Sequence, residues 1–149
     1  MQTALLQCVK VLTAAAAGLA VCAAAWAQEK TVGGLVINLG LMNAEKAVQA
    51  EGHRDAHPSK FSGGSQHLLI TLADAKSHAR VANAEVVVAV RDPRGHVEEK
   101  PLLHTQAAGL PDYSELFVFG WEGRYTLSVR ITAPGAKRVE TSFTLDHRL

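Results

Sequence analysis

Apolar and polar residues alternate with a period of two over several short stretches in the second half of the chain. The clearest alternation covers residues 123–131, where the apolar members are Tyr125, Leu127, Val129 and Ile131. Because successive side chains of a strand point to opposite faces, this stretch predicts a strand with one buried and one solvated face. Its tyrosine follows a turn that contains Gly120 and Gly123. An aromatic residue in that place is typical of the tyrosine corner of immunoglobulin-like sandwiches.

Similar patterns predict further strands over residues 35–39, 67–73, 84–91, 99–105, 113–119 and 139–146. Turn signals separate several of them, such as Asp92-Pro93-Arg94-Gly95. Apart from a short helix expected over residues 43–52, no helical period intervenes, so neighbouring strands should pair antiparallel. We therefore predict an all-β fold, a single immunoglobulin-like antiparallel β-sandwich of about seven strands.

The first 27 residues have a different character from the rest. They hold one charge, Lys10, before an apolar run that ends in Ala25-Trp26-Ala27, and polar residues follow at once. This order is typical of a secretory signal peptide and predicts cleavage after Ala27. A transmembrane anchor is the alternative, but the run is shorter than the ~20 residues that a spanning helix needs. We expect a periplasmic domain over residues 28–149, with no stable membrane insertion after cleavage.

Both cysteines, Cys8 and Cys22, lie in this predicted leader. Cys22 ends a stretch with the outline of a lipobox, but Val21 stands where Gly, Ala or Ser is expected, so lipid anchoring there is the lesser alternative. Residues 28–149 contain no cysteine, which excludes a disulfide or a thiolate metal site in the exported domain.

Charge excludes one class of partner. Without Lys10 the 15 basic residues become 14, which match the 14 acidic residues. The domain has no basic stripe, so we expect no nucleic-acid partner. All seven histidines lie in residues 28–149, which is the most unusual feature of their composition.

Several of these histidines lie in or beside a predicted loop over residues 43–66. The candidate metal ligands there are Met42, His53, Asp55, His57 and His67. Imidazole suits Cu(II) and Zn(II), and a thioether adds affinity for Cu(I). The alternative is that the histidines are solvated side chains on a long loop, since such loops are often merely mobile.

His104 is a further candidate ligand, because it lies where a predicted strand turns into a loop. It could complete a site with His67. The alternative is a half-buried histidine whose ring nitrogens bond to the backbone.

An aromatic group could serve as an interaction face. Its members are Tyr113, Phe117, Phe119 and Trp121. Leu116 and Val118 alternate with the phenylalanines, so both faces of this strand are apolar and one could bind a partner. Packing in the core is the alternative for the aromatic residues.

The sequence contains none of the common catalytic patterns. It has no nucleophile elbow, no His-Glu-x-x-His pattern and no phosphate-binding glycine loop. We therefore predict that the protein is not an enzyme and has no organic cofactor.

Residues 84–95, 111–119 and 123–129 resemble the small exported β-sandwich domains called YtkA-like. Related envelope sandwiches include copper-resistance carriers similar to the CopC family, so the resemblance implies a copper ligand. The chain departs from the CopC pattern, because Gln28 rather than His would follow the cleavage site and Met42 is the one methionine left.

Together these observations predict a periplasmic, non-catalytic protein that binds copper, or zinc as a second candidate, for buffering or delivery. The predicted ligands are Met42, His53, Asp55, His57, His67 and His104. The alternative is an interaction module for an envelope protein partner, which docks through a sheet edge or the aromatic face and has no metal role.

Overall fold

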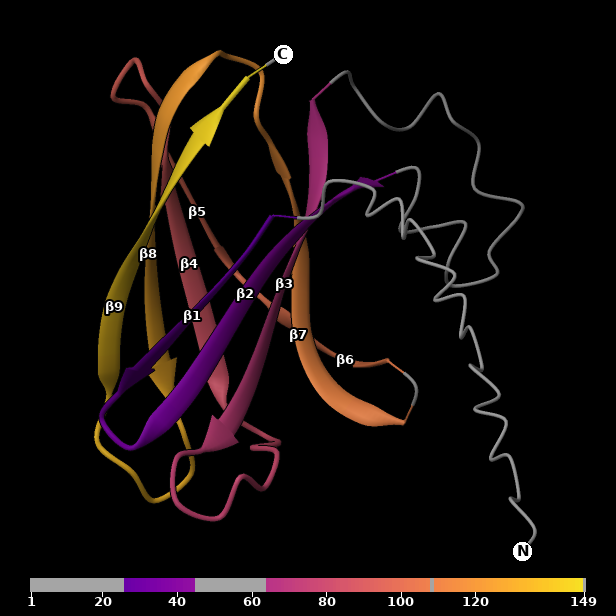
Figure 1. The fold of residues 1–149 in the computed structure, drawn as a ribbon, viewed down its shortest axis with the longest axis vertical. Helices are drawn as coiled ribbons and strands as arrows, with labels where there is room; N and C mark the ends of the chain where they lie inside the picture. Colours follow the sequence, from indigo (N-terminus) through magenta and orange to yellow (C-terminus); the bar gives the residue numbers. More distant parts are fainter. Residues whose placement is uncertain (1–25, 45–63, 108, 149) are drawn as a thin grey trace, which may run out of the picture.

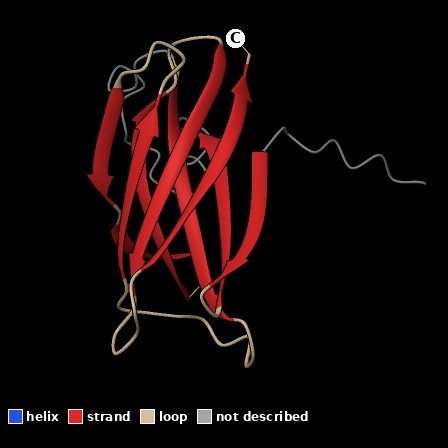
Figure 2. Cartoon of the chain, turned by 90° about the vertical axis from the view of Figure 1, so that its left-hand side faces the viewer, coloured by secondary structure: helices blue, strands red, loops and turns tan. Residues whose placement is uncertain are grey.

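The computed structural model describes residues 26–44, 64–107 and 109–148, which form two antiparallel β-sheets packed face to face (Figure 1). Figure 2 shows that strands and the loops between them make up this part of the chain. The described residues contain nine strands, which are β1 (Trp26–Val32), β2 (Leu35–Asn43), β3 (Ser65–Asp74), β4 (Glu85–Arg91), β5 (Val97–Pro101), β6 (Leu103–Ala107), β7 (Leu110–Val118), β8 (Gly123–Thr132) and β9 (Val139–His147).

One sheet has five strands in the order β1-β2-β3-β7-β6, and the other has four in the order β5-β4-β8-β9. Every pair of neighbouring strands is antiparallel. This arrangement confirms the predicted all-β sandwich. The expectation of about seven strands was too low, and two local features explain the difference.

The first feature is β1, which the alternation of apolar residues did not predict. It pairs with β2 from Trp26 opposite Leu41 to Val32 opposite Leu35, around a turn at Gly33-Gly34 with φ values of 58° and 79°. Most of its residues are polar and at least partly exposed, because an edge strand needs to bury little of its surface. Hydrogen bonding to β2, and not burial, defines this strand.

The second feature is a crossing between the sheets within the strand predicted over residues 99–105. The chain leaves β5 at Pro101 and enters the other sheet as β6 at Leu103. Leu102 lies between them with its side chain buried, and its N–H donates to the Val86 carbonyl at 2.8 Å. The crossing therefore divides one predicted strand into two.

The core lies between the sheets and consists of alternate residues of the inner strands. Leu127, Val129 and Ile131 of β8 are fully buried, as their alternation predicts. Tyr125 is also buried, and its hydroxyl donates to the Trp121 carbonyl at 3.0 Å and accepts from the Trp121 N–H at 3.0 Å. This contact confirms the predicted tyrosine corner.

Residues 1–25 and 45–63 lie outside the described part of the chain. These ranges hold all of the predicted signal peptide except Trp26 and Ala27, which belong to β1, and all of the helix predicted over residues 43–52 except its first two residues, so both remain predictions. In the part that is described, no helix is long and apolar enough to cross a membrane.

Candidate metal-binding site

Met42 and His67 are directly opposite each other on the neighbouring strands β2 and β3. Their sequence neighbours Leu41 and Leu68 also pair and are buried in the core. Because side chains alternate along a strand, Met42 and His67 lie together on the outer face of the five-stranded sheet. Met42 is 38% exposed and His67 is partly exposed, so both can be reached from solvent.

This pairing places a thioether and an imidazole within reach of one ion. Cβ atoms of residues directly opposite in an antiparallel pair lie about 5 Å apart. Both side chains are long enough to turn toward a shared point above the sheet. A sulfur and a nitrogen donor together suit copper better than Mg²⁺ or Ca²⁺, which prefer oxygen. Two ligands alone do not fill a copper or zinc coordination sphere, so further donors are required.

The segment that contains three other predicted ligands starts and ends beside this pair. The chain leaves β2 at Asn43 and enters the adjacent strand β3 at Ser65. Asn43 is opposite Gln66, the position next to the Met42–His67 pair. His53, Asp55 and His57 belong to the connection, but they lie outside the described residues. The structure therefore fixes where their segment begins and ends, next to the candidate pair.

His104 does not join this pair. It lies on β6 opposite Tyr113, and the two rings form an edge contact with centroids 5.4 Å apart. His67 lies opposite Leu116, three positions further along β7. Since side chains alternate, an odd separation puts His67 and His104 on opposite faces of the sheet. The prediction that His104 could complete a site with His67 is therefore not supported by the register.

The described residues contain no group of three or more His, Cys, Asp or Glu side chains that could hold a metal ion. His78 and His96 are exposed and lie in loops between strands. A complete metal site on the outer face thus depends on ligands beyond the described residues.

The residue that the sequence did not single out is Asp112 on β7. Its side chain is buried, and Arg80 Nη1 lies 3.9 Å from its carboxylate. Burial raises the pKa of Asp112, while Arg80 and then His104 act in the opposite direction. The sequence around Asp112 does not indicate that this side chain is buried. Its partner Arg80 lies 32 positions earlier in the chain, so the pair leaves no local pattern.

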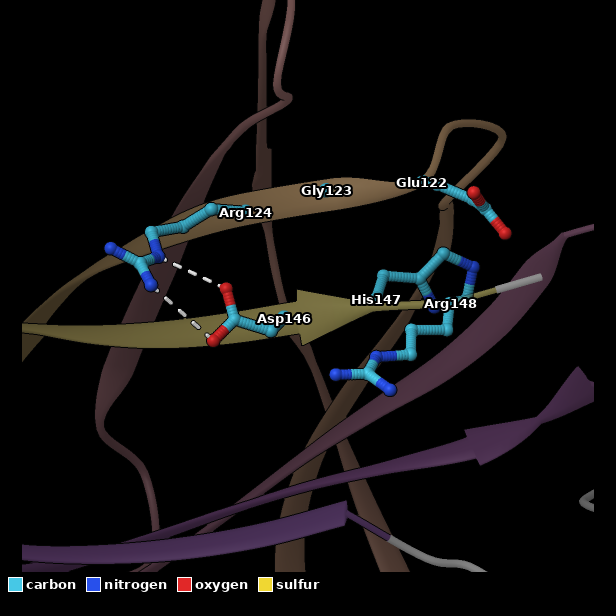
Figure 3. Close-up of a pocket in the computed structure, with 6 residues that line it drawn as sticks. All are labelled: Glu122, Gly123, Arg124, Asp146, His147 and Arg148. Carbon is cyan, nitrogen blue, oxygen red and sulfur yellow. Dashed lines mark hydrogen bonds and ion pairs between the residues drawn. The ribbon is translucent and has the colours of Figure 1, made fainter.

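A shallow depression at the ends of β8 and β9 is a second place where polar groups gather (Figure 3). It is lined by Glu122, Gly123, Arg124, Asp146, His147 and Arg148. Arg124 Nε donates to the Asp146 carboxylate at 3.0 Å, and this hydrogen bond lowers the pKa of Asp146. The His147 ring lies 6.0 Å from the rings of Phe119 and Tyr125, and its buried Nε2 has no hydrogen-bond partner among the described residues.

The depression includes none of the predicted ligands. Its charged side chains are of both signs, and Arg124 and Asp146 are both largely exposed and already paired. This composition favours a solvated surface over a ligand site.

The predicted aromatic interaction face is mostly core. Tyr113, Phe117 and Phe119 are fully buried between the sheets, so these three residues are not available to a partner. Trp121 is exposed, and the guanidinium carbon of Arg94 lies 3.2 Å from its ring centroid. Packing in the core, the alternative interpretation, is correct for the three buried residues.

Exposed apolar residues do occur on β2, β6 and β7, and on β2 and β7 they alternate with buried residues. They lie on the outer face of the five-stranded sheet and include Met42, Leu103, Leu116 and Val118. His67 lies between Met42 and Leu116 in the same row across the sheet. The candidate metal pair is therefore set in a largely apolar surface.

The fold is shared with solved structures of bacterial proteins at low sequence identity. A DUF4426 family protein from Pseudomonas aeruginosa PAO1 has a TM-score of 0.64 and 15% identity, covering 80% of this chain and 96% of its own. FetP from uropathogenic Escherichia coli strain F11, produced in the periplasm, has a TM-score of 0.63 and 12% identity, covering 83% and 96%. Copper-reconstituted P19 from Campylobacter jejuni has a TM-score of 0.63 and 11% identity, with the same coverage.

No protein-family model and no curated protein matches the sequence. The similarity to YtkA-like domains thus remains a resemblance in sequence pattern. The structural comparisons establish a common β-sandwich fold with the DUF4426, FetP and P19 proteins, some of which are solved with copper bound.

Proposed function

We propose that this protein binds copper reversibly on the outer face of its five-stranded sheet, for buffering or delivery, with zinc as the second candidate. The observation that carries the proposal is the direct cross-strand pairing of Met42 with His67. His53, His57 and Asp55 would complete the site from the connection between β2 and β3. His104 lies on the opposite face and is left out of this ligand set.

Two further points support copper. A thioether beside an imidazole is a donor set that favours copper over hard cations, and it is held by two paired strands and not by a loop. A variant of FetP and the P19 protein, which share the fold, are solved with copper bound. We also propose that the protein acts by chelation without turnover and resides in the periplasm after removal of residues 1–27.

The proposal is tested by calorimetric titration of protein expressed from the complete sequence with Cu(II) and Zn(II), and by anaerobic competition with a Cu(I) chelator. We expect one ion per chain with micromolar or tighter affinity, which corresponds to about 8 kcal/mol. His67→Ala should weaken copper binding at least tenfold, about 1.4 kcal/mol. Met42→Leu keeps the apolar volume and should weaken Cu(I) more than Cu(II).

His96→Ala is the matched control, because His96 is an exposed histidine in the hairpin between β4 and β5, in the other sheet. It should bind copper as the wild type does. A His53→Ala/His57→Ala double variant tests the contribution of the connecting segment. Copper binding that survives both His67→Ala and this double variant would overturn the proposal.

The second candidate function is a non-catalytic interaction module for an envelope protein. It is favoured by the exposed apolar residues on the outer face, among them Leu116 and Val118. If the wild type binds neither copper nor zinc, this function takes precedence. Crosslinking in the cell envelope would then be lost in a Leu116→Ser/Val118→Ser variant but retained in His67→Ala.

A further inference from the structure

The two sheets end in four edge strands, β1 and β6 in one sheet and β5 and β9 in the other. An edge strand presents unpaired backbone N–H and C=O groups and can pair with a strand of another molecule. Proteins prevent this pairing with charged side chains, prolines or a covering group. The four edges of this protein differ in how far they are protected.

Side chains of β1 protect part of the edge β9. Gln28 Nε2 donates to the Thr144 carbonyl at 3.2 Å, and Lys30 Nζ donates to the Ser142 carbonyl. These bonds cover part of the exposed backbone of β9 with side chains of β1. Both strands also carry charges, Glu29 and Lys30 on β1 and Glu140 and Asp146 on β9.

The edge β5 is protected by its own sequence. Three of its five residues, Glu98, Glu99 and Lys100, are charged, and it ends in Pro101, which lacks an N–H. Lys100 Nζ also reaches across to the Leu116 carbonyl of β7 at 2.8 Å. A strand of another molecule that paired with β5 would therefore lie against charged side chains, which disfavours the pairing.

Among the residues that the structure describes, none protects the edge β6 in these ways. Its sequence, Leu103 to Ala107, contains no Asp, Glu, Lys, Arg or Pro. Residues 103–106 are all exposed, and Leu103 is the most exposed large apolar side chain of the described residues, at 63%. Within the described part of the chain, β7 is the one strand paired with β6.

Pairing with a second copy distinguishes the edges further. When a strand pairs antiparallel with itself about its midpoint, the central residue meets its own copy. This places Glu29 against Glu29 in β1 and Glu99 against Glu99 in β5, and it places Glu140 against Asp146 in β9. Like charges directly opposite are destabilising. In β6 the central residue is Thr105, and a Thr–Thr pair is favourable.

We infer that β6 is a self-association edge, where two copies of this chain pair antiparallel about a two-fold axis at Thr105. Leu103 of one copy then lies opposite Ala107 of the other, and His104 lies opposite Gln106. The two five-stranded sheets become one continuous sheet, and their outer apolar faces join. Such an isologous contact closes on itself and does not lead to a fibre.

The predicted interface is separate from the candidate metal pair. Met42 and His67 lie on β2 and β3, with β7 between them and β6. Metal binding and self-association should therefore respond to different substitutions, so either proposal can fail without the other.

The test is sedimentation equilibrium of protein expressed from the complete sequence, in a chelator-containing buffer that removes metal. The wild type should form a dimer with a dissociation constant in the micromolar range. Thr105→Lys and Thr105→Glu each place like charges at the two-fold axis and should weaken the dimer about tenfold or more. An equimolar mixture of these two variants should recover dimer, because Lys then lies opposite Glu.

Thr31→Lys is the matched control, since Thr31 is an exposed threonine on β1, the other edge of the same sheet. It should dimerise as the wild type does. Circular dichroism and thermal unfolding confirm that each variant is folded, and the recovery in the mixture makes the result independent of small losses in stability. A monomeric wild type at the highest accessible concentration, or a dimer that persists in both Thr105 variants, would overturn the inference.

Discussion

The two ends of the sandwich are each closed by a buried tyrosine that makes the same kind of contact. At the end where β8 begins, Tyr125 bonds to the backbone of Trp121. At the opposite end, where β7 begins, the Tyr113 hydroxyl donates to the Val81 carbonyl at 3.0 Å and accepts from the Ala84 N–H at 2.9 Å. We name these the Tyr125 end and the Tyr113 end.

The difference between the ends lies in the distance along the chain. Tyr125 bonds to a residue four positions earlier, so its contact stabilises a local turn. Tyr113 bonds to residues 29 and 32 positions earlier, and it anchors the loop between β3 and β4 to β7. A local contact leaves a pattern in the sequence, whereas a distant contact is visible once the strands are paired.

The largest effect is expected from Gly64→Ala at the Tyr125 end. Gly64 has φ of +90°, and an added Cβ would lie 2.7 Å from the Phe119 carbonyl oxygen. The substitution combines an unfavourable backbone conformation with a clash against backbone, and we expect a loss of about 3 kcal/mol in the free energy of unfolding. Urea denaturation measures it.

Gly34→Ala is the control for this clash, because Gly34 has φ of +79° and no atom within 4 Å of an added Cβ. It should lose about 1 kcal/mol. Equal losses for the two variants would show that the close approach to Phe119 contributes nothing. Because Gly64 directly precedes β3, Gly64→Ala should also weaken copper binding if the proposed site is correct.

The next effect separates the two tyrosines directly. Tyr113→Phe removes two hydrogen bonds that hold a distant loop, and we expect a loss of about 2 kcal/mol. Tyr125→Phe removes two hydrogen bonds within one turn. The freed Trp121 N–H and C=O can hydrogen-bond to water instead, so we expect a loss of about 1 kcal/mol in the free energy of unfolding. Hydrogen exchange at the Val81 and Ala84 amides should accelerate in Tyr113→Phe alone. An equal loss in both variants would contradict the distinction between local and distant anchoring.

The same distinction explains how much the sequence could predict. Alternation and a turn signal predicted β8 and its tyrosine corner, because period and turn chemistry are local. Placing Met42 and His67 beside a histidine-containing loop was also possible, since they lie at either end of that segment.

The remaining features depend on which strands pair. Three of them follow from strand register or from contacts between residues distant in sequence. They are the position of His104 on the opposite face, the burial of Asp112 and the sheet crossing at Leu102. A hydrophobic pattern does not encode those relations. Tyr113 shows the same limit, because its aromatic character alone could not distinguish core from interface.

A smaller effect at the Tyr125 end is expected from Arg94→Ala. The Arg94 guanidinium stacks on the exposed Trp121 ring, and such a contact contributes about 0.5–1 kcal/mol at an exposed site. Arg94→Lys keeps the charge but loses the planar stacking, so it should recover part of this amount. Thermal unfolding and Trp121 fluorescence measure the change, and an unaltered emission spectrum in Arg94→Ala would exclude the stack in solution.

The smallest effects are those of pH, and they have opposite signs at the two ends. At the Tyr125 end, the hydrogen bond from Arg124 lowers the pKa of Asp146 from its ordinary value of 3.8. The stabilisation from this pair is present above pH 3.8 and is lost as pH falls through the lower pKa of the folded state. At the Tyr113 end, burial raises the pKa of Asp112 above 3.8. Its contribution is largest below pH 3.8 and is lost as pH rises through the higher pKa of the folded state.

Urea unfolding of the wild type, Asp112→Asn and Asp146→Asn between pH 3 and pH 8 separates these two contributions. The wild type should gain stability relative to Asp112→Asn as pH falls toward 3.8, because a protonated Asp112 is no longer a buried charge. It should lose stability relative to Asp146→Asn below pH 3.8, because Arg124 then loses its charged partner. If the stability of the wild type relative to Asp112→Asn instead rose with pH above 3.8, the ion pair with Arg80 would outweigh burial, and the Tyr113 end would behave electrostatically like the Tyr125 end.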